Sequence, residues 1–205
     1  MLATLIRFVT GVQDRWVGSD PVGPDGDPVQ RVYFANHASH LDAPVVWAAL
    51  PGAVRALTRP VAARDYWTAD PLRRFVSGQL RVVLVDRIRV EGGPPPTAPI
   101  EQALRDGDSL IFFPEGTRNL DPERGLLAFK SGLYHLARQF PDVEFVPVHL
   151  ANLNRFLPKG ELVPVPVLAR VSFGAAVPVR EGETKDAYLS RARLALASLS
   201  EVEDG

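Results

Sequence analysis

The chain has 205 residues, of which 46% are hydrophobic, so it is long enough to bury the core of one domain. Its formal net charge is −1 and it has no lysine- or arginine-rich run, so nothing in the sequence indicates a nucleic-acid partner. The chain contains no cysteine, which excludes disulfides, thiolate metal sites and a cysteine nucleophile.

No stretch of the sequence approaches the roughly 18 consecutive apolar residues that a membrane-spanning helix needs. Residues 1–17 carry charged side chains and lack the apolar block and cleavage site of a signal peptide. We therefore expect a cytoplasmic protein without a membrane-spanning segment.

Residues 1–17 are predicted to form an N-terminal amphipathic helix. Such a helix either packs on the rest of the domain or lies on a membrane surface, with Trp16 and the arginines at the level of the headgroups. Residues 18–28 are rich in proline, glycine and aspartate and are predicted to form a loop. The helix prediction depends on apolar residues that recur at steps of three and four, namely Leu2, Leu5, Ile6, Val9, Val12 and Trp16.

From residue 31 onward, short apolar runs alternate with helical patterns. The runs predict strands at 31–35, 54–58, 81–85, 109–113 and 144–148, and the proline-broken run at 163–173 predicts an edge strand or two short strands. Helices are predicted at 42–50, 71–76, 100–106 and 129–139, and Thr184 is expected to cap a final helix. This alternation predicts that residues 31–205 form a single α/β domain with a mostly parallel central sheet flanked by helices.

Polar residues follow three of the predicted strands. His37 comes just after the strand at 31–35, Asp86 and Arg87 follow the strand at 81–85, and residues 115–118 follow the strand at 109–113. In an open α/β sheet, ligands bind beyond the carboxyl ends of the strands. A parallel sheet would therefore gather these side chains into one crevice.

His37 and Asp42 are the candidate catalytic pair. A neutral imidazole is well matched to removing a hydroxyl proton near pH 7, and a carboxylate on its far nitrogen fixes the tautomer. Two other interpretations remain open from the residues alone. Asp42 could merely close a helix N-terminus in a capping box with Ser39, or His37, His40 and Asp42 could bind zinc, although the spacing lacks a typical zinc signature and we expect no metal.

The segment 113–119 reads Phe-Pro-Glu-Gly-Thr-Arg-Asn and is predicted to be a sharp turn after a strand. Its backbone N–H groups and the planar fork of Arg118 are suited to binding an anion such as phosphate. The plainer alternative is a loop in which Glu115 and Arg118 pair with each other. Lys130 could add a second phosphate contact or could simply be an exposed lysine, and Arg87 could simply pair with Asp86.

Together these segments resemble the glycerolipid acyltransferases related to 1-acylglycerol-3-phosphate (lysophosphatidate) acyltransferase. The Asn-His-x-Ser-x-x-Asp block at 36–42 resembles the first motif of that family. Residues 85–87 resemble the end of its second motif, residues 113–119 its third, and residues 146–148 its fourth, which is mostly structural. The resemblance covers roughly residues 31–179, with the motifs in the family's order and spacing.

The resemblance implies an O-acyltransferase that moves a fatty acyl group from acyl-CoA or acyl-carrier protein to a lysophospholipid, most plainly 1-acylglycerol-3-phosphate. It implies that His37 is the base, oriented by Asp42, with no covalent intermediate and no cofactor beyond the acyl donor. It also implies that the phosphate-bearing acceptor is held by Arg87, Glu115, Gly116, Thr117 and Arg118.

Two departures from the family's pattern bear on the acceptor. Many members have hydrophobic N-terminal helices that enter the bilayer, whereas here residues 1–17 are the only candidate, which suggests a peripheral protein on the inner face of the membrane. Ala63-Arg64 also stands where many members have Ala-Lys. The same chemistry on a lyso-aminolipid or a soluble alcohol, a thioester hydrolase and a non-catalytic lipid-binding domain are the competing functions.

Overall fold

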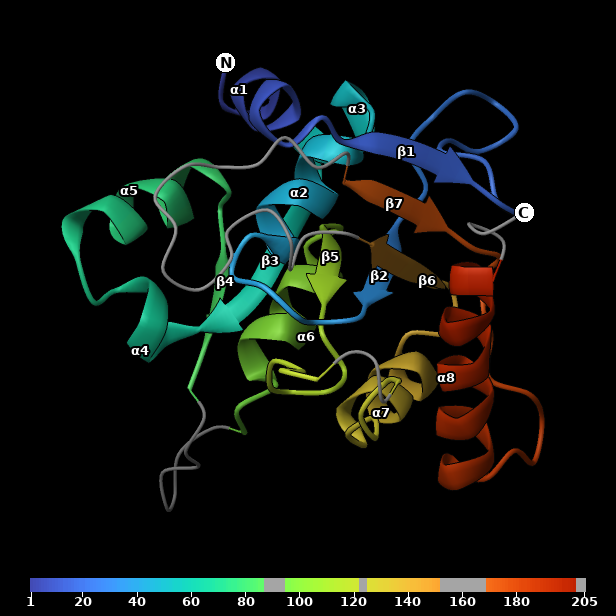
Figure 1. The fold of residues 1–205 in the computed structure, drawn as a ribbon. Coiled ribbons are helices and arrows are strands. Elements are labelled where there is room, and N and C mark those ends of the chain that lie inside the picture. Colours follow the sequence, from blue (N-terminus) through green and yellow to red (C-terminus); the bar gives the residue numbers. More distant parts are fainter. Residues whose placement is uncertain (87–94, 122–124, 152–168, 202–205) are drawn as a thin grey trace.

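The computed structural model describes residues 1–86, 95–121, 125–151 and 169–201. A seven-stranded sheet runs through the centre of the molecule in the order β1-β7-β6-β2-β5-β3-β4 (Figure 1). All neighbouring strands are parallel except β6 and β7, which are antiparallel. The predicted α/β domain with a mostly parallel sheet is therefore confirmed. The strands are β1 (Gln13–Trp16), β2 (Arg31–Ala35), β3 (Thr58–Ala63), β4 (Val83–Val85), β5 (Ser109–Phe112), β6 (Glu144–Ala151) and β7 (Arg170–Phe173).

Helices cover both faces of this sheet (Figure 1). They are α1 (Leu2–Thr10), α2 (Asp42–Ala49), α3 (Gly52–Ala56), α4 (Arg64–Trp67), α5 (Pro71–Gln79), α6 (Ala98–Arg105), α7 (Gly132–Gln139) and α8 (Lys185–Glu201). None of the helices in these described ranges is both long enough and apolar enough to cross a bilayer.

Strand β2 shows how the sequence builds the two layers of the core. Its five residues are all buried, as expected for a central strand of a parallel sheet. Successive side chains of a strand point to opposite faces, so Val32 and Phe34 join a cluster with α6, α7 and α8. Tyr33 and Ala35 join the cluster on the other face, which includes α2. The strand thus anchors the residues that follow it, 36–42, between two packed layers.

The N-terminal helix is shorter than predicted. It ends at Thr10, because Gly11 adopts the left-handed conformation (φ 57°) and turns the chain into strand β1. Trp16 belongs to that strand, and its ring stacks on Phe173 with 4.1 Å between the ring centroids. The extension of the helix through Trp16 was therefore wrong: the three- and four-residue spacing continued by chance into an edge strand that pairs with β7.

The strand predicted at 54–58 was also wrong. Residues 52–56 form helix α3, which starts after Pro51, and the strand begins only at Thr58. The hydroxyl of Thr58 donates to the carbonyl of Val54 and closes the helix. For the run at 163–173, the edge-strand alternative is wrong, because strand β7 lies between β1 and β6. The alternative of two short strands is not tested, because residues 163–168 lie outside the described residues.

The other predicted strands and helices are confirmed, with shifts at their ends. Helix α5 begins at a proline, with Asp70 accepting a hydrogen bond from the backbone N–H of Arg73. Thr184 accepts a hydrogen bond from the backbone N–H of Ala187 and caps α8, as predicted. The apolar face of α8, including Tyr188 and Ala192, is fully buried against the sheet.

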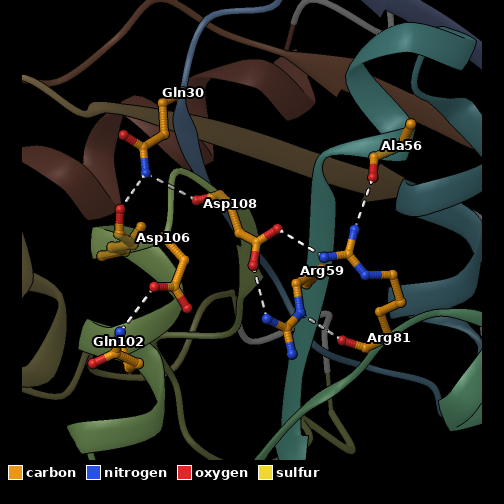
Figure 2. Close-up of polar contacts among 8 residues, drawn as sticks. Gln30, Ala56, Arg59, Arg81, Gln102, Asp106 and Asp108 are labelled. Carbon is orange, nitrogen blue, oxygen red and sulfur yellow. Dashed lines mark hydrogen bonds and ion pairs between the residues drawn. The ribbon is translucent and has the colours of Figure 1, made fainter.

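A carboxylate ties together the amino ends of β3, β4 and β5 (Figure 2). Asp108, just before β5, accepts from Arg59 of β3 at 2.7 Å and from Arg81, which precedes β4, at 3.1 Å. Gln30 donates to the carbonyl of Asp108 and links β2 to the same point. These contacts align the strands at one end of the sheet, so their carboxyl ends, where the polar motifs lie, also emerge side by side.

Candidate active site

The turns after β2 and β5 meet at the carboxyl end of the sheet. The two strands are adjacent and parallel, and Phe34 pairs in register with Phe112. His37 and Glu115 lie on the turns that follow these strands, and the backbone N–H of His37 donates to Oε1 of Glu115 at 3.0 Å. The structure therefore brings two of the three predicted polar clusters into direct contact.

His37 and Asp42 form a hydrogen-bonded pair. Nδ1 of His37 lies 2.9 Å from Oδ2 of Asp42, which is the first residue of α2 and is only 1% exposed. A carboxylate that accepts from Nδ1 leaves Nε2 as the proton acceptor of the ring. The pair therefore has the arrangement that general-base catalysis requires.

The capping interpretation of Asp42 is correct only in part. Oδ2 of Asp42 also accepts the backbone N–H groups of Ala38 at 2.7 Å and Ser39 at 2.8 Å. The hydroxyl of Ser39 accepts from the N–H of Leu41 instead of from Asp42, so the reciprocal half of a capping box does not form. Asp42 thus shapes the turn and orients the imidazole at once.

Two further contacts hold His37. Its ring stacks on Phe113, with 4.3 Å between the ring centroids. Its carbonyl accepts the backbone N–H of Asn119 at 2.6 Å. The side chain remains 22% exposed, so the imidazole is held in place while part of it is open to solvent.

A cleft of about 650 Å³ opens beside His37. Gly116, Thr117, Arg118 and Lys130 all line it, and all four are exposed. Gly116 has a φ of 68°, which makes the turn sharp, and the carbonyl of Pro114 accepts the backbone N–H of Lys130 at 2.8 Å. Two positive side chains and the candidate base therefore border the same space.

Part of the lining of the cleft is built from aromatic rings. His40 stacks on Tyr66 at 4.3 Å with nearly parallel planes, and the guanidinium of Arg73 lies 4.1 Å from the centroid of the same tyrosine ring. Burial lowers the pKa of His40, and the nearby positive charges of Arg118 and Arg73 lower it further. His40 thus lines the cleft through its stacking on Tyr66. Within the described ranges, no group of three or more side chains that could hold a metal ion is found.

Glu115 lies beneath the cleft and is only 1% exposed. Its two carboxylate oxygens accept the backbone N–H groups of His37 and of Leu127, each at 3.0 Å. Burial raises the pKa of Glu115, although these two hydrogen bonds act in the opposite direction. It lines a second cavity of about 300 Å³, which His37 and Asp42 also line. Glu115 therefore bonds to the backbone rather than pairing with Arg118 in the way that the plainer interpretation expected.

The third predicted cluster is only partly described. Arg87 lies outside the described residues. Asp86 ends the described part of that segment and pairs with Arg64 at 3.0 Å, in an ion pair whose two side chains are both exposed. Arg64 is the residue that stands where many members of the resembling family have lysine, and here it links α4 to the end of β4.

Sequence reasoning assigned no role to two asparagines that hold the site together. The side chain of Asn36 donates to the carbonyl of Leu150 at 3.0 Å and accepts the N–H of the same residue at 2.8 Å, which fastens the His37 turn to β6. The side chain of Asn119 donates to the carbonyl of Gly125 at 2.7 Å. Both lie inside the quoted motifs, but an amide's partner in the backbone of a distant strand leaves no pattern in the sequence.

A mostly parallel α/β sheet has a His-x₄-Asp pair beyond β2 and the Phe-Pro-Glu-Gly-Thr-Arg turn beyond the adjacent strand β5. This combination is typical of a glycerolipid acyltransferase domain. Residues 26–151 match the model of the Acyltransferase family. The chain belongs to this family.

Individual relatives agree with this assignment. The chain is 33% identical to a 1-acyl-sn-glycerol-3-phosphate acyltransferase of Limnanthes douglasii, over 82% of this chain and 59% of the relative. It is 33% identical to the human 1-acyl-sn-glycerol-3-phosphate acyltransferase alpha, over 76% of this chain and 52% of that protein. The chain therefore spans little more than half the length of these relatives.

The fold is shared with a solved structure. The crystal structure of the 1-acyl-sn-glycerophosphate (LPA) acyltransferase PlsC from Thermotoga maritima superimposes with a TM-score of 0.70 and 18% sequence identity. The match covers 98% of this chain and 79% of that chain. At this identity the likeness concerns the fold.

Proposed function

We propose that this protein transfers a fatty acyl group from an acyl thioester to the free hydroxyl of 1-acylglycerol-3-phosphate, giving phosphatidate. The observation that carries this proposal is that His37, Arg118 and Lys130 line one cleft. A base and two cations in the same space suit an acceptor that has a hydroxyl to deprotonate and a phosphate to bind. The names of the relatives in plants and humans point to the same substrate.

The mechanism uses His37 as a general base. Nε2 removes the proton of the acceptor hydroxyl as the oxygen attacks the thioester carbonyl, and Asp42 stabilises the imidazolium that forms. The tetrahedral intermediate then expels the thiolate, which takes the proton back from His37. The acyl group moves directly to the acceptor, because the attacking oxygen is that of the acceptor and no enzyme nucleophile is needed.

Arg118, Lys130 and Thr117 would bind the phosphate. All three side chains are exposed on the cleft wall formed by the turn after β5 and the segment before α7. A guanidinium offers two parallel N–H donors to phosphate oxygens, and an ammonium adds a second positive charge. Gly116 is needed for its φ of 68°, which L side chains rarely adopt, because a Cβ there would make only ordinary contact with the stem of Lys130.

The donor would be acyl-CoA or acyl-carrier protein, and the acceptor would be taken from a membrane surface. Helix α1 supports the second point, because Leu5 and Phe8 are exposed apolar residues on its outer side. Arg7 bonds to the carbonyl of Ala48 and to Asp14, and so ties the helix to the domain. We infer a peripheral position on the inner face of the membrane, with the apolar side of α1 turned toward the lipids.

The decisive experiment offers purified protein palmitoyl-CoA together with lysophosphatidate, lysophosphatidylethanolamine, a lyso-aminolipid or glycerol. Free thiol is followed over time and the lipid products are identified by mass spectrometry. Thiol release that depends on lysophosphatidate, with phosphatidate as product, is the expected result. Thiol release that persists without any acceptor would instead identify a hydrolase, and acylation of another acceptor alone would overturn the choice of substrate.

A further inference from the structure

Glu115 differs from the three residues that follow it on the same turn. Gly116, Thr117 and Arg118 are exposed on the cleft, whereas Glu115 is fully buried beneath them. Its carboxylate spans two chain segments, with Oε1 on the N–H of His37 and Oε2 on the N–H of Leu127. Both oxygens are therefore occupied by backbone donors that belong to other loops.

The main chain of His37 is held from both sides by the turn after β5. Glu115 accepts its N–H at 3.0 Å, and the N–H of Asn119 donates to its carbonyl at 2.6 Å. Asp42 holds the ring itself at 2.9 Å. The placement of the imidazole thus depends on a glutamate that lies 78 residues away in the chain.

The second bond of Glu115 reaches the segment that carries a cation of the cleft. Leu127 lies three residues before Lys130, whose own N–H donates to the carbonyl of Pro114. One carboxylate therefore sets the distance between the turn with the base and the segment with the cation. A buried carboxylate is costly unless its oxygens accept hydrogen bonds, and here two backbone donors offset part of that cost.

We propose that Glu115 is a positioning residue that fixes His37 relative to the segment leading to Lys130, and that its carboxylate does not contact the acceptor. This inference rests on the proposed function, since it takes His37 as the base. It departs from the role in holding the phosphate-bearing acceptor that the resemblance implies for Glu115. Repulsion between a buried carboxylate and a phosphate points in the same direction.

Glu115→Gln distinguishes a residue that positions His37 from a residue that binds the acceptor. Glutamine has the same shape, but it offers one acceptor oxygen and one NH₂ donor to two backbone N–H donors. One of the two hydrogen bonds must therefore break, because the NH₂ group of the glutamine would face a backbone N–H. The side chain keeps its volume, but it no longer fixes both chain segments. A ligand of the acceptor would behave differently, because its loss would weaken substrate binding.

Steady-state kinetics on Glu115→Gln, Arg118→Ala and Glu181→Gln test the positioning role of Glu115. Glu181 is an exposed glutamate that does not line the cleft, and it serves as the matched control. We expect Glu115→Gln to lower kcat by roughly 10- to 100-fold, as misplacement of a catalytic group does, with the KM for the phosphate-bearing acceptor nearly unchanged. A raised KM with an unchanged kcat would overturn the proposal.

Amide hydrogen exchange adds a readout that a general loss of stability would not mimic. In Glu115→Gln, exchange at the N–H of His37 or Leu127 should speed up while amides in the centre of β2 keep their protection. Unchanged protection at both amides would contradict the proposed bonds. If the variant does not fold, a pH titration of the wild-type protein is followed by NMR. The amide chemical shifts of His37 and Leu127 should then change with the same midpoint pH as the carboxyl signal of Glu115. Different midpoints would overturn the proposal.

These outcomes are separable from the fate of the proposed function. If the wild-type enzyme acylates a different acceptor, the same comparison of kcat and KM is made with that acceptor. If it transfers no acyl group at all, the proposed function fails, while the amide measurements still decide whether Glu115 holds the turn that carries His37.

Discussion

Asp42 holds the imidazole of His37 and the turn that carries it with one oxygen atom. Oδ2 lies 2.9 Å from Nδ1 of His37 and also accepts the N–H groups of Ala38 and Ser39. The orientation of the ring and the conformation of the turn are therefore coupled. A change at Asp42 should affect both, whereas a change at His37 should leave the turn intact.

His37→Ala should abolish most of the activity and preserve the fold. Loss of a general base lowers the rate by roughly 10²–10⁴-fold, and the turn after β2 keeps its hydrogen bonds to Asp42 and Glu115. The variant is compared with His135→Ala, which removes an exposed histidine on α7. Thiol release and circular dichroism are measured for both. A His37→Ala enzyme that retains more than about a tenth of the wild-type kcat would exclude this residue as the base.

Asp42→Asn should cost activity and some stability. An amide oxygen can replace Oδ2 for the N–H groups, but it cannot stabilise the imidazolium; the matching change in a serine protease triad lowers kcat by about 10⁴-fold. Asp106→Asn on the surface is the control, because this exposed carboxylate accepts a hydrogen bond from the exposed side chain of Gln102. kcat and Tm are measured together. If Asp42→Asn lowers Tm while kcat per folded molecule stays at the wild-type level, the carboxylate serves the turn alone.

Arg118→Ala should chiefly raise the KM for a phosphate-bearing acceptor. A charge-assisted hydrogen bond contributes about 1.5–3 kcal/mol, which corresponds to roughly a 10- to 100-fold increase in KM. An uncharged monoacylglycerol should show little change with the same variant. Arg138→Ala, on the exposed side of α7, is the control. Equal effects on charged and uncharged acceptors would place Arg118 away from the phosphate.

The sequence predicted the parts of the fold that depend on local patterns. Central strands such as β2 and β5 are short, apolar and followed by polar motifs, and the final helix has an apolar face and a threonine cap. The junction of α1 and β1 could not be predicted, because Val12 and Trp16 fit a helical spacing as well as they fit burial against β7. Only the pairing with a strand more than 150 residues away decides between them.

In the candidate site, too, local sequence patterns predicted some features and missed those that depend on distant segments. The candidate base, its carboxylate and the exposed turn were predicted because each is a motif with its own chemistry. The role of Glu115 was not predicted, because a glutamate that follows a strand looks the same in the sequence whether it faces the cleft or the backbone of another loop. Burial and the two N–H donors make the difference, and both are created by the packing of distant segments.

Phe8→Asp should weaken binding to lipid vesicles. Phe8 is 86% exposed on α1, and transfer of a phenylalanine side chain out of water contributes about 1.5–3 kcal/mol, so vesicle binding should fall by at least about tenfold. Leu194→Asp changes an equally apolar exposed residue on α8, which lies on another side of the molecule (Figure 1). Sedimentation with phosphatidylglycerol vesicles compares the two. Similar pelleting of both variants would show that α1 does not contact the membrane.

Glu183→Gln should remove part of the acid sensitivity of folding. Glu183 accepts two hydrogen bonds from Arg191 of α8, at 2.9 and 2.7 Å, and this contact lowers the pKa of Glu183 from 4.5 to about 2. Because the pKa is lower in the folded state, the stabilisation is fully present above pH 4.5 and is lost as the pH falls from about 4.5 to about 2.

Urea unfolding from pH 2 to pH 7 measures this contribution to the free energy of unfolding. Glu183→Gln should be less stable than the wild type at pH 7, and the difference should shrink as the wild-type carboxylate becomes protonated. Glu181→Gln, two residues earlier and exposed, should keep the wild-type dependence on pH. A Glu183→Gln curve parallel to that of the wild type between pH 4.5 and 2 would contradict this prediction. It would mean that Glu183 binds protons equally well in the folded and unfolded chains, so that its pair with Arg191 does not contribute to acid unfolding.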